Sequence, residues 1–303
     1  MPHASRLRAN QPPTKPLRVV ILGSAAGAAA AERTERALAG HGHMVSAVGP
    51  SQASGEHAGP IAEADLVVVL GGDGSILRAA RWMGYHQVPA LGINLGRLGF
   101  LADTPPADVE DAIAELMAGR FRLVDHMMFE CEVAREGEVI HHDLGLNETS
   151  ILAGPPFAMI EIDLLVDGQP ATTYRADGLI VSTPVGSTAY NLSAGGPIVR
   201  KDMDAFVFTP LNPHTLTNRT VIDSADRRYE LRVPRPNAGS TCLVDGRVAA
   251  AVAPGDAIRI RRARPRFTLV EIGGHGYYST LREKLAWGGG LRAAERSRPE
   301  VDS

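Results

Sequence analysis

The hydrophobic positions in the first 120 residues form short runs that alternate with helical stretches. Leu17 to Gly23 and Leu66 to Leu70 are apolar, mostly β-branched runs with the length of a buried strand, and Val88 to Asn94 repeats the pattern. Ala28 to Gly40 and Val109 to Gly119 instead space their apolar residues as a helix does. Strands that alternate with helices predict a doubly wound α/β domain with a parallel sheet, whose ligands bind at the carboxyl ends of the strands.

The pattern changes from Arg122 onward, where glycine-containing turns separate the apolar runs. Three such turns, at residues 135–137, 167–168 and 245–246, predict hairpins and a mostly antiparallel β domain. Tyr278 to Trp287 regains a helical pattern, and its late position indicates a helix that packs back on the first domain. The expected organisation is a disordered extension over 1–16, an α/β domain over 17–121, a β-rich domain over 122–275, and a C-terminal helix with a frayed tail over 276–303.

Composition and charge restrict the class of protein. The 303 residues are 44% hydrophobic, which is enough for one large core or two of ordinary size. The formal net charge of -3 provides no basic field to attract a nucleic-acid polymer. Cys131 and Cys242 have no C-x-x-C partner, so we interpret both as buried thiols. No apolar run approaches the ~20 residues of a membrane span, and residues 1–18 lack a signal-peptide core, so we expect a cytoplasmic protein without a membrane partner.

The strongest chemical signal follows the run Leu66 to Leu70, where Gly71-Gly72-Asp73-Gly74-Ser75 precedes a return to helical spacing. Glycines let backbone N–H groups approach a ligand, and a helix that starts near Ser75 would direct its dipole at an anion. Phosphates repel the Asp73 carboxylate unless it holds Mg²⁺ or takes a proton from an attacking hydroxyl. The alternative is an ordinary turn in which Asp73 caps the helix, because aspartate is a preferred N-cap residue.

A second candidate site lies between residues 175 and 197, where hydroxyls, glycines, an amide and an aromatic residue are crowded together. An adenosine could stack on Tyr190 and form hydrogen bonds with Thr188, Asn191 and Ser193. A purely structural loop would not need this composition. We therefore expect a ligand site in this stretch.

Five segments together, in their order and spacing, resemble the bacterial NAD kinase family. They are Leu70 to Ser75, Asn94 to Asp103, Leu146 to Glu148, Asp177 to Pro197 and Thr209 to Leu216. The glycine turn alone is shared with lipid kinases and, more distantly, phosphofructokinases. The resemblance covers residues 17 to 285 and implies ATP-dependent phosphorylation of the adenosine-ribose 2'-hydroxyl of NAD to give NADP. It also implies Mg²⁺ that arrives with ATP and a homodimer or homotetramer.

The resemblance assigns roles to individual residues. Asp73 resembles the proton acceptor, and the chain lacks a carboxylate cage for a resident metal. The residues that resemble nucleotide-binding positions are Gly72, Gly74, Ser75, Arg78, Phe100, Asn147, Glu148, Arg175, Asp177, Thr188, Ala189, Tyr190, Asn191, Leu192, Ser193 and Arg247. Arg247 stands where a neutral residue is expected. Thr149 and Ser150 stand where apolar residues are common, which predicts a more exposed strand.

Two other classes of function stay open at this point. A lipid kinase shares the glycine turn but should carry a wide apolar groove, which the hydroxyl-rich stretch 183–193 does not provide. A non-catalytic dinucleotide sensor would keep the adenosine loop but would not need Asp73 in the turn. The sequence does not decide between ATP and polyphosphate, or between NAD and NADH.

Overall fold

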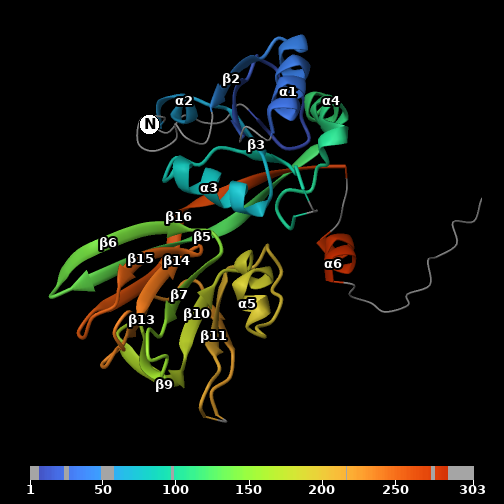
Figure 1. Ribbon diagram of the computed structural model, residues 1–303. Coiled ribbons are helices and arrows are strands. Elements are labelled where there is room, and N and C mark those ends of the chain that lie inside the picture. Colours follow the sequence, from blue (N-terminus) through green and yellow to red (C-terminus); the bar gives the residue numbers. More distant parts are fainter. Residues whose placement is uncertain are drawn as a thin grey trace, which may run out of the picture.

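The computed structural model describes residues 7–23, 27–48, 58–96, 99–215, 217–273 and 277–285 (Figure 1). Its first part is the expected α/β domain with a parallel sheet, whose strands are hydrogen-bonded in the order β2-β1-β3-β4. These strands are β1 (Arg18–Gly23), β2 (Met44–Val48), β3 (Leu66–Leu70) and β4 (Ala90–Ile93). The helices of this part are α1 (Ala28–Gly40), α2 (Ala58–Ala62), α3 (Asp73–Met83) and α4 (Val109–Met117), with a 3₁₀ turn, η3 (Pro106–Asp108), before α4.

Helices cover both faces of this sheet, which explains the continuous apolar run of β3. Leu66, Val68 and Leu70 join a core with α1 and α4, whereas Val67 and Val69 join a core with α2 and α3. Successive side chains of a strand point to opposite faces, so a strand covered on both sides needs apolar residues at every position. The doubly wound arrangement expected from the sequence is confirmed.

The second part is mostly antiparallel, as expected. Its strands are β5 (Phe121–Arg135), β6 (Glu138–Gly145), β7 (Glu148–Leu152), β8 (Ile160–Val166), β9 (Gln169–Ala176), β10 (Gly178–Ser182), β11 (Ala205–Leu211), β12 (Val221–Ser224), β13 (Tyr229–Arg232), β14 (Thr241–Val244), β15 (Arg247–Ala251) and β16 (Ala257–Ile272). Six of them form a separate sheet in the order β12-β11-β10-β7-β14-β15. The helical pieces are η4 (Gly186–Thr188), α5 (Tyr190–Ser193) and α6 (Tyr277–Leu285).

The two long strands β5 and β16 connect the two parts. They pair along their length, from Ala134 with Ala257 to Phe121 with Ile272, and β16 also pairs with β4 of the parallel sheet. The result is one ten-stranded sheet that continues from the parallel strands into β13, β8 and β9. The division expected near residue 121 therefore lies at the start of a strand that belongs to both parts (Figure 1).

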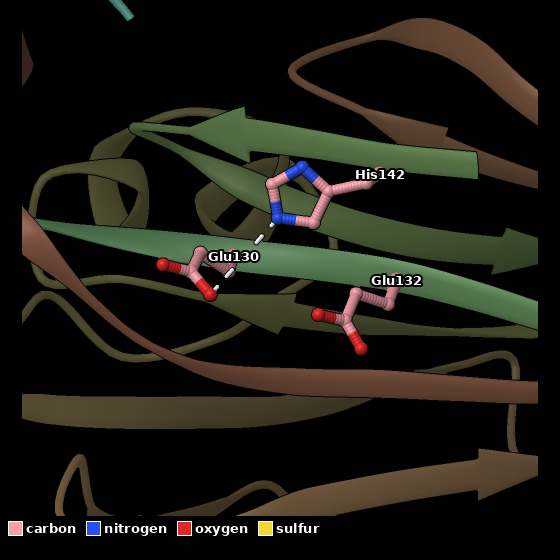
Figure 2. A group of neighbouring side chains, drawn as sticks. All are labelled: Glu130, Glu132 and His142. Carbon is pink, nitrogen blue, oxygen red and sulfur yellow. Dashed lines mark ion pairs between the residues drawn. The ribbon is translucent and has the colours of Figure 1, made fainter. Parts of the chain in front are cut away.

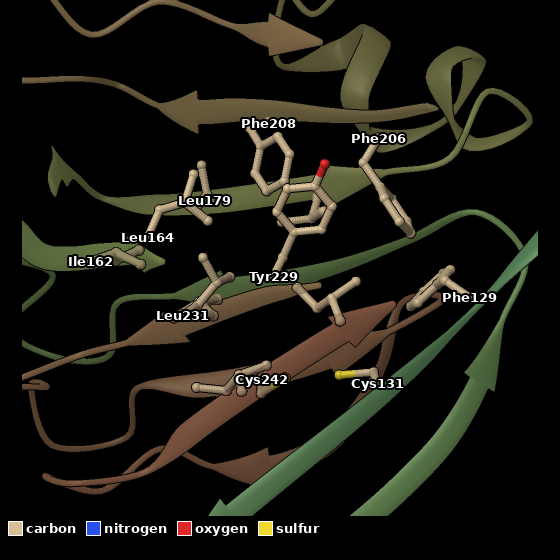
Figure 3. Close-up of a cluster of buried hydrophobic side chains, with 14 of the residues drawn as sticks. Phe129, Cys131, Ile162, Leu164, Leu179, Phe206, Phe208, Tyr229, Leu231 and Cys242 are labelled. Atoms are coloured by element: carbon tan, nitrogen blue, oxygen red, sulfur yellow. The ribbon is translucent and has the colours of Figure 1, made fainter. Parts of the chain in front are cut away.

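A third apolar core fills the space between the continuous sheet and the six-stranded sheet (Figure 3). Phe206, Phe208 and Tyr229 form its aromatic centre, with ring centroids 4.8 to 5.6 Å apart around Tyr229. Cys131 and Cys242 are free thiols buried in this core. Thr149 Oγ1 lies 3.6 Å from one sulfur and 3.7 Å from the other.

Some expectations about single segments differ from the structure. Leu7 is buried in the core with α1, and the N–H of Asn10 donates to the carbonyl of Phe121, so the described part of the expected extension contacts the first domain at these two residues, while most of residues 8–16 are exposed. Thr149 and Ser150 are buried, not exposed, because β7 lies in the interior of the six-stranded sheet. The expected end of α6 at Trp287, the tail beyond it and residues 1–6 lie outside the described residues. None of the described helices is long and apolar enough to cross a membrane.

Candidate active site

The glycine turn, residues 71–75, joins β3 to α3, and neighbouring atoms do not cover its backbone at Gly72 and Gly74. Gly71 has φ of 154°, and a Cβ there would collide with the Ser75 hydroxyl. A Cβ on Gly72 or Gly74 would meet no atom within 4 Å. The backbone of these two glycines is therefore accessible at the first turn of α3, where N–H groups without intrahelical partners favour an anion.

Asp73 is the first residue of α3, with Gly72 as N-cap, so the helix begins two residues before Ser75, where the sequence placed its start. The structure does not contain the alternative of a capping aspartate, because the N-cap residue is Gly72 and Asp73 is already inside the helix. The Asp73 carboxylate instead accepts three backbone N–H groups of another loop, from Phe100 (2.8 Å), Leu101 (2.9 Å) and Ala102 (3.1 Å). A Cβ on Gly99 would collide with this carboxylate, so the loop can approach Asp73 this closely only because residue 99 is a glycine.

A second buried carboxylate shapes the corner before β7. The N–H groups of Leu146 (2.9 Å), Asn147 (2.8 Å) and Glu148 (3.2 Å) all donate to Asp245 in the β14–β15 turn. Burial raises the pKa of Asp245, and these three N–H groups act in the opposite direction. Asp245 therefore fixes the backbone that presents Asn147 and Glu148.

Glu148 itself is buried and one of its oxygens, Oε2, has no hydrogen-bond partner among the described residues. Burial first, and then the charge of Asp245, raise the pKa of Glu148 to about 8, while the backbone N–H of Tyr190 acts to lower it. A buried polar atom without a partner costs free energy that a bound ligand can recover. The corner is thus suited to bind a hydroxyl or amine group of a ligand.

The expected adenosine loop forms two short helical pieces, η4 and α5, next to this corner. Thr183 Oγ1 donates to the carbonyl of Leu146 (2.6 Å), and the Asn147 carbonyl accepts the N–H of Thr183 (2.8 Å). Tyr190 and Ser193 are exposed, and Thr188, Ala189 and Leu192 are half-buried. These five residues lie where a ligand can reach them.

Asn191 differs from its neighbours in the loop, because it is fully buried. Its amide donates to the carbonyls of Ser187 (3.1 Å) and Pro197 (3.0 Å), and its oxygen accepts the hydroxyl of Thr209 (2.6 Å). In the described structure, Asn191 therefore stabilises the conformation of the loop.

A cleft of about 410 Å³ lies where the Phe100 loop, the segment after the adenosine loop and α6 meet. Lys201 Nζ donates to the carbonyl of Phe100, and Lys284 Nζ of α6 lies 4.4 Å from the centroid of the Phe100 ring. Tyr278 of α6 accepts a hydrogen bond from Arg200 (3.3 Å). Helix α6 thus contacts the Phe100 loop of the first part and Arg200 of the second.

Two arginines of α3, Arg78 and Arg81, lie near Arg247 at the start of β15. Arg78 donates to the Ser75 hydroxyl (3.2 Å), and Arg247 pairs with Asp143 on β6. Burial first, and then the charges of Arg247 and Arg78, lower the pKa of Arg81, while Asp143 and Asp245 raise it. This arrangement brings Ser75, Arg78 and Arg247 into one region with the Asn147–Glu148 corner.

Arg175 and Asp177 are the two predicted site residues that the described chain does not bring to this region. They lie before β10, whereas Glu148 is paired with Ser182 at its far end, about 16 Å away at the usual rise of a strand. Arg175 pairs with Glu161 (3.0 Å), and Asp177 accepts hydrogen bonds from Asn212 (3.0 Å) and His214 (3.2 Å).

A trio outside this region, Glu130, Glu132 and His142, has the residue types of a metal site (Figure 2). Their candidate ligand atoms lie within 4.8 Å of one another. Arg261 pairs with both glutamates, and His142 accepts or donates a hydrogen bond with the Tyr85 hydroxyl (3.1 Å). The Arg261 guanidinium offsets one of the two carboxylate charges and binds both groups, so the trio is part of an ion-pair network on the sheet.

Sequence reasoning missed three residues that build the site. Asp245 was interpreted only as a hairpin turn residue, and Thr183 only as part of a hydroxyl-rich stretch. Lys201 was not singled out, although it is one of only three lysines in the chain and none lies in the glycine turn. The rarity of lysine was the one signal that could have drawn attention to it.

Comparison with known proteins agrees with these observations. The sequence model of the ATP-NAD kinase N-terminal domain matches residues 52–121, and that of the ATP-NAD kinase C-terminal domain matches residues 146–272. An NAD kinase of Rhodopirellula baltica is 53% identical over 229 residues, which cover 76% of this chain and 74% of the relative. An NAD kinase of Chromohalobacter salexigens is 42% identical over 257 residues, 84% of this chain and 85% of the relative.

Two solved structures share the fold. Yeast NADH kinase complexed with NADH superposes with a TM-score of 0.83 at 23% identity, over 93% of this chain and 91% of that chain. An NAD kinase from Archaeoglobus fulgidus in complex with ATP superposes with a TM-score of 0.72 at 26% identity, over 88% and 98%. With one relative 53% identical over 76% of its length and another 42% identical over 84%, the chain belongs to the NAD kinase family.

Proposed function

We propose that the chain transfers the γ-phosphoryl group of ATP to the 2'-hydroxyl of the adenosine ribose of NAD, with Asp73 as the general base. The observation that carries this proposal is the position of Asp73 at the open glycine turn, close to a loop that its carboxylate holds. The solved relatives were crystallised with NADH and with ATP, which supports this pair of substrate classes.

The residues present can perform the steps that such a transfer requires. The open backbone at Gly72 and Gly74, with the N-terminus of α3, would bind phosphate oxygens. Tyr190 and its exposed neighbours would bind the adenosine, and the unpartnered oxygen of Glu148 would bind a ribose hydroxyl. Transfer then depends mainly on alignment of the 2'-oxygen with the γ-phosphorus and on charge neutralisation.

Mg²⁺ fits this site only as an ion that arrives with ATP. A carboxylate has about four lone-pair positions, and three backbone N–H groups already occupy those of Asp73. The remaining position of Asp73 is the one that would accept the hydroxyl proton, so the ligands of the ion would be phosphates and water, which is how Mg²⁺ is usually bound with nucleotides. The ion would supply neutralisation of phosphate charge, and the chain would supply the alignment.

The position of Arg175 and Asp177 bears on the proposed homodimer or homotetramer. A single NAD molecule can contact both these residues and the Asn147–Glu148 corner of the same chain only if it extends along β10. Otherwise a second copy of the chain must supply either Arg175 and Asp177 or the corner. We keep the oligomer as a proposal, and sedimentation analysis at micromolar concentration checks it: a monomer at all concentrations would rule it out.

A coupled assay tests the proposed function. Purified protein with ATP and Mg²⁺ should convert NAD to NADP, and removal of the divalent ion with a chelator should abolish turnover. NADH, polyphosphate and a diacylglycerol acceptor serve as parallel arms that define acceptor and donor. Phosphorylation of the lipid without formation of NADP would contradict the proposal.

A further inference from the structure

Lys201 and Asp73 lie on the two sides of one residue, Phe100. The N–H of Phe100 donates to Asp73 Oδ2 (2.8 Å), and the carbonyl of Phe100 accepts from Lys201 Nζ. The two charged groups come from opposite halves of the chain, 128 positions apart by number, since Asp73 starts α3 and Lys201 follows the adenosine loop. The fold thus brings a cation next to the carboxylate that we propose as the base.

The surroundings of the ammonium show that it is partly withdrawn from water and electrostatically coupled to Asp73. Burial is the largest effect and lowers the pKa of Lys201, while the charges of Glu271, Asp73 and Asp103 raise it. The charge of Lys284 acts with burial and lowers the pKa of Lys201. Charge interactions gain strength where solvent is excluded, so this cation acts strongly on whatever lies in the cleft.

Lys201 also has donors to offer. An ammonium carries three N–H groups. One of them binds the Phe100 carbonyl, and the described structure gives the other two no hydrogen-bond partner. Lys201 lines a cleft of about 410 Å³, whose other charged residues are Asp103, Arg122, Arg200, Asp202 and Glu271. Arg122 pairs with Glu271 and Arg200 with Asp202, so these four charges are offset in pairs.

We propose that Lys201 binds the γ-phosphoryl group of the triphosphate while it is transferred. The assignment rests on the proposed function. P-loop kinases place a lysine within their glycine-rich turn, where it contacts the β- and γ-phosphates. This chain has no lysine in residues 71–75, and the second half of the chain supplies one that binds the Phe100 residue held by Asp73.

The chemistry balances with Lys201 as a fixed charge. The 2'-oxygen forms a bond to the γ-phosphorus while the bond from that phosphorus to the bridging oxygen of ADP breaks. The bridging oxygen leaves with the electron pair, and the hydroxyl proton passes to Asp73. Lys201 gives and takes no proton; its charge stabilises the negative charge on the three equatorial oxygens of the transition state.

A purely structural role is the competing explanation, in which Lys201 only anchors the Phe100 loop. Two substitutions separate the roles. Lys201→Gln keeps a donor for the Phe100 carbonyl but removes the charge, whereas Lys201→Arg keeps the charge. Lys284→Gln is a matched control, because it removes a lysine charge beside the same phenylalanine without removing a hydrogen bond to its backbone.

The test measures kcat, the KM for ATP and the KM for NAD in the wild type and the three variants, with thermal unfolding as a check of folding. We expect Lys201→Gln to lower kcat by about 10²-fold, the size of effect found when one group that stabilises transition-state charge is removed. Lys201→Arg should recover most of that loss, the KM for NAD should change by less than about threefold, and Lys284→Gln should keep kcat within about threefold of wild type.

The outcomes separate the two proposals. An active wild type with an equally active Lys201→Gln enzyme would remove Lys201 from the reaction and leave the proposed function intact. Equal losses in the Gln and Arg variants, together with a lower unfolding temperature, would assign Lys201 to loop anchoring alone and overturn the proposal. A wild-type protein that makes no NADP would instead contradict the proposed function.

Discussion

The Asp73 carboxylate holds a loop, and in the proposed function it also accepts a proton. Its three N–H bonds use both oxygens, with Phe100 on Oδ2 and with Leu101 and Ala102 on Oδ1. Asparagine has one oxygen and one amide, so in Asp73→Asn an N–H group would face another N–H group. The structure therefore predicts a loss of loop order in addition to a loss of chemistry.

We expect Asp73→Asn to lower kcat by about 10²- to 10⁴-fold, the usual contribution of a positioned base. The unsatisfied N–H group should also lower the free energy of unfolding, by about 1 kcal/mol. Steady-state kinetics and urea denaturation measure the two effects. Asp108→Asn is the matched control, because Asp108 precedes α4 and makes no side-chain capping bond. A kcat within about threefold of wild type would exclude Asp73 as the base.

At the scale of elements, two hairpins with the same Asp-Gly turn have different tasks. In the β14–β15 turn, Asp245 (φ 46°) and Gly246 (φ 73°) bind the corner before β7. In the β8–β9 turn, Asp167 (φ 50°) and Gly168 (φ 80°) have a similar backbone, but the Asp167 carboxylate accepts the N–H of Arg228 (2.9 Å), just before the neighbouring strand β13. Local turn chemistry is the same, and only the neighbours differ.

This pair gives a prediction with an internal control. Asp245→Ala should raise the KM for NAD by about tenfold or more, because three N–H groups of the Asn147–Glu148 corner lose their acceptor, at about 1 kcal/mol or more each. Asp167→Ala should cost stability without a change in the KM for NAD. Kinetics with NAD as the varied substrate distinguish them, and equal KM values in both variants would show that the corner does not bind NAD.

At the scale of the whole molecule, two buried titratable groups shape the dependence of stability on pH. His126 is fully buried against Phe267. Burial first, and then the charge of Lys201, lower its pKa to about 3, while the backbone of Lys201 acts to raise it. The unfolded chain binds this proton below about pH 6.5, so stability is lost as pH falls from there towards 3. For Glu148, with its pKa raised to about 8, stability is present at acidic pH and is lost as pH rises from about 4.5 to 8.

We therefore expect the two substitutions His126→Phe and Glu148→Gln to change the pH profile of stability in opposite ways. Each group contributes a slope of about 1.4 kcal/mol per pH unit within its own window. Urea denaturation at pH 4, 5.5, 7 and 8.5 measures both effects. His126→Phe should remove the loss of stability that occurs as pH falls, and Glu148→Gln should remove the loss of stability that occurs as pH rises. Parallel profiles for the wild type and a variant would mean that the group titrates normally in the folded protein.

The sequence by itself determined the elements and the chemical character of the site. The alternation of short apolar runs with helical spacing placed β1, β3, β4, α1 and α4 close to their observed bounds, because strand and helix periodicities are local properties. The Gly-containing turns located the hairpins for the same reason. Two stretches, Leu70 to Ser75 and Asp177 to Pro197, resemble one enzyme family. This resemblance indicated the class of enzyme, which the relatives confirm.

Only the tertiary structure decided which side chains meet. Asp245 contacts a corner 97 to 99 positions away, and Lys201 contacts a residue 101 positions away. The continuous sheet through β5 and β16, the burial of Thr149 and of Asn191, and the distance of Arg175 and Asp177 from the glycine turn likewise depend on how the two sheets pack. A residue pattern encodes the face on which a side chain lies, but the partner on that face is set by strand order and register between segments far apart in the chain.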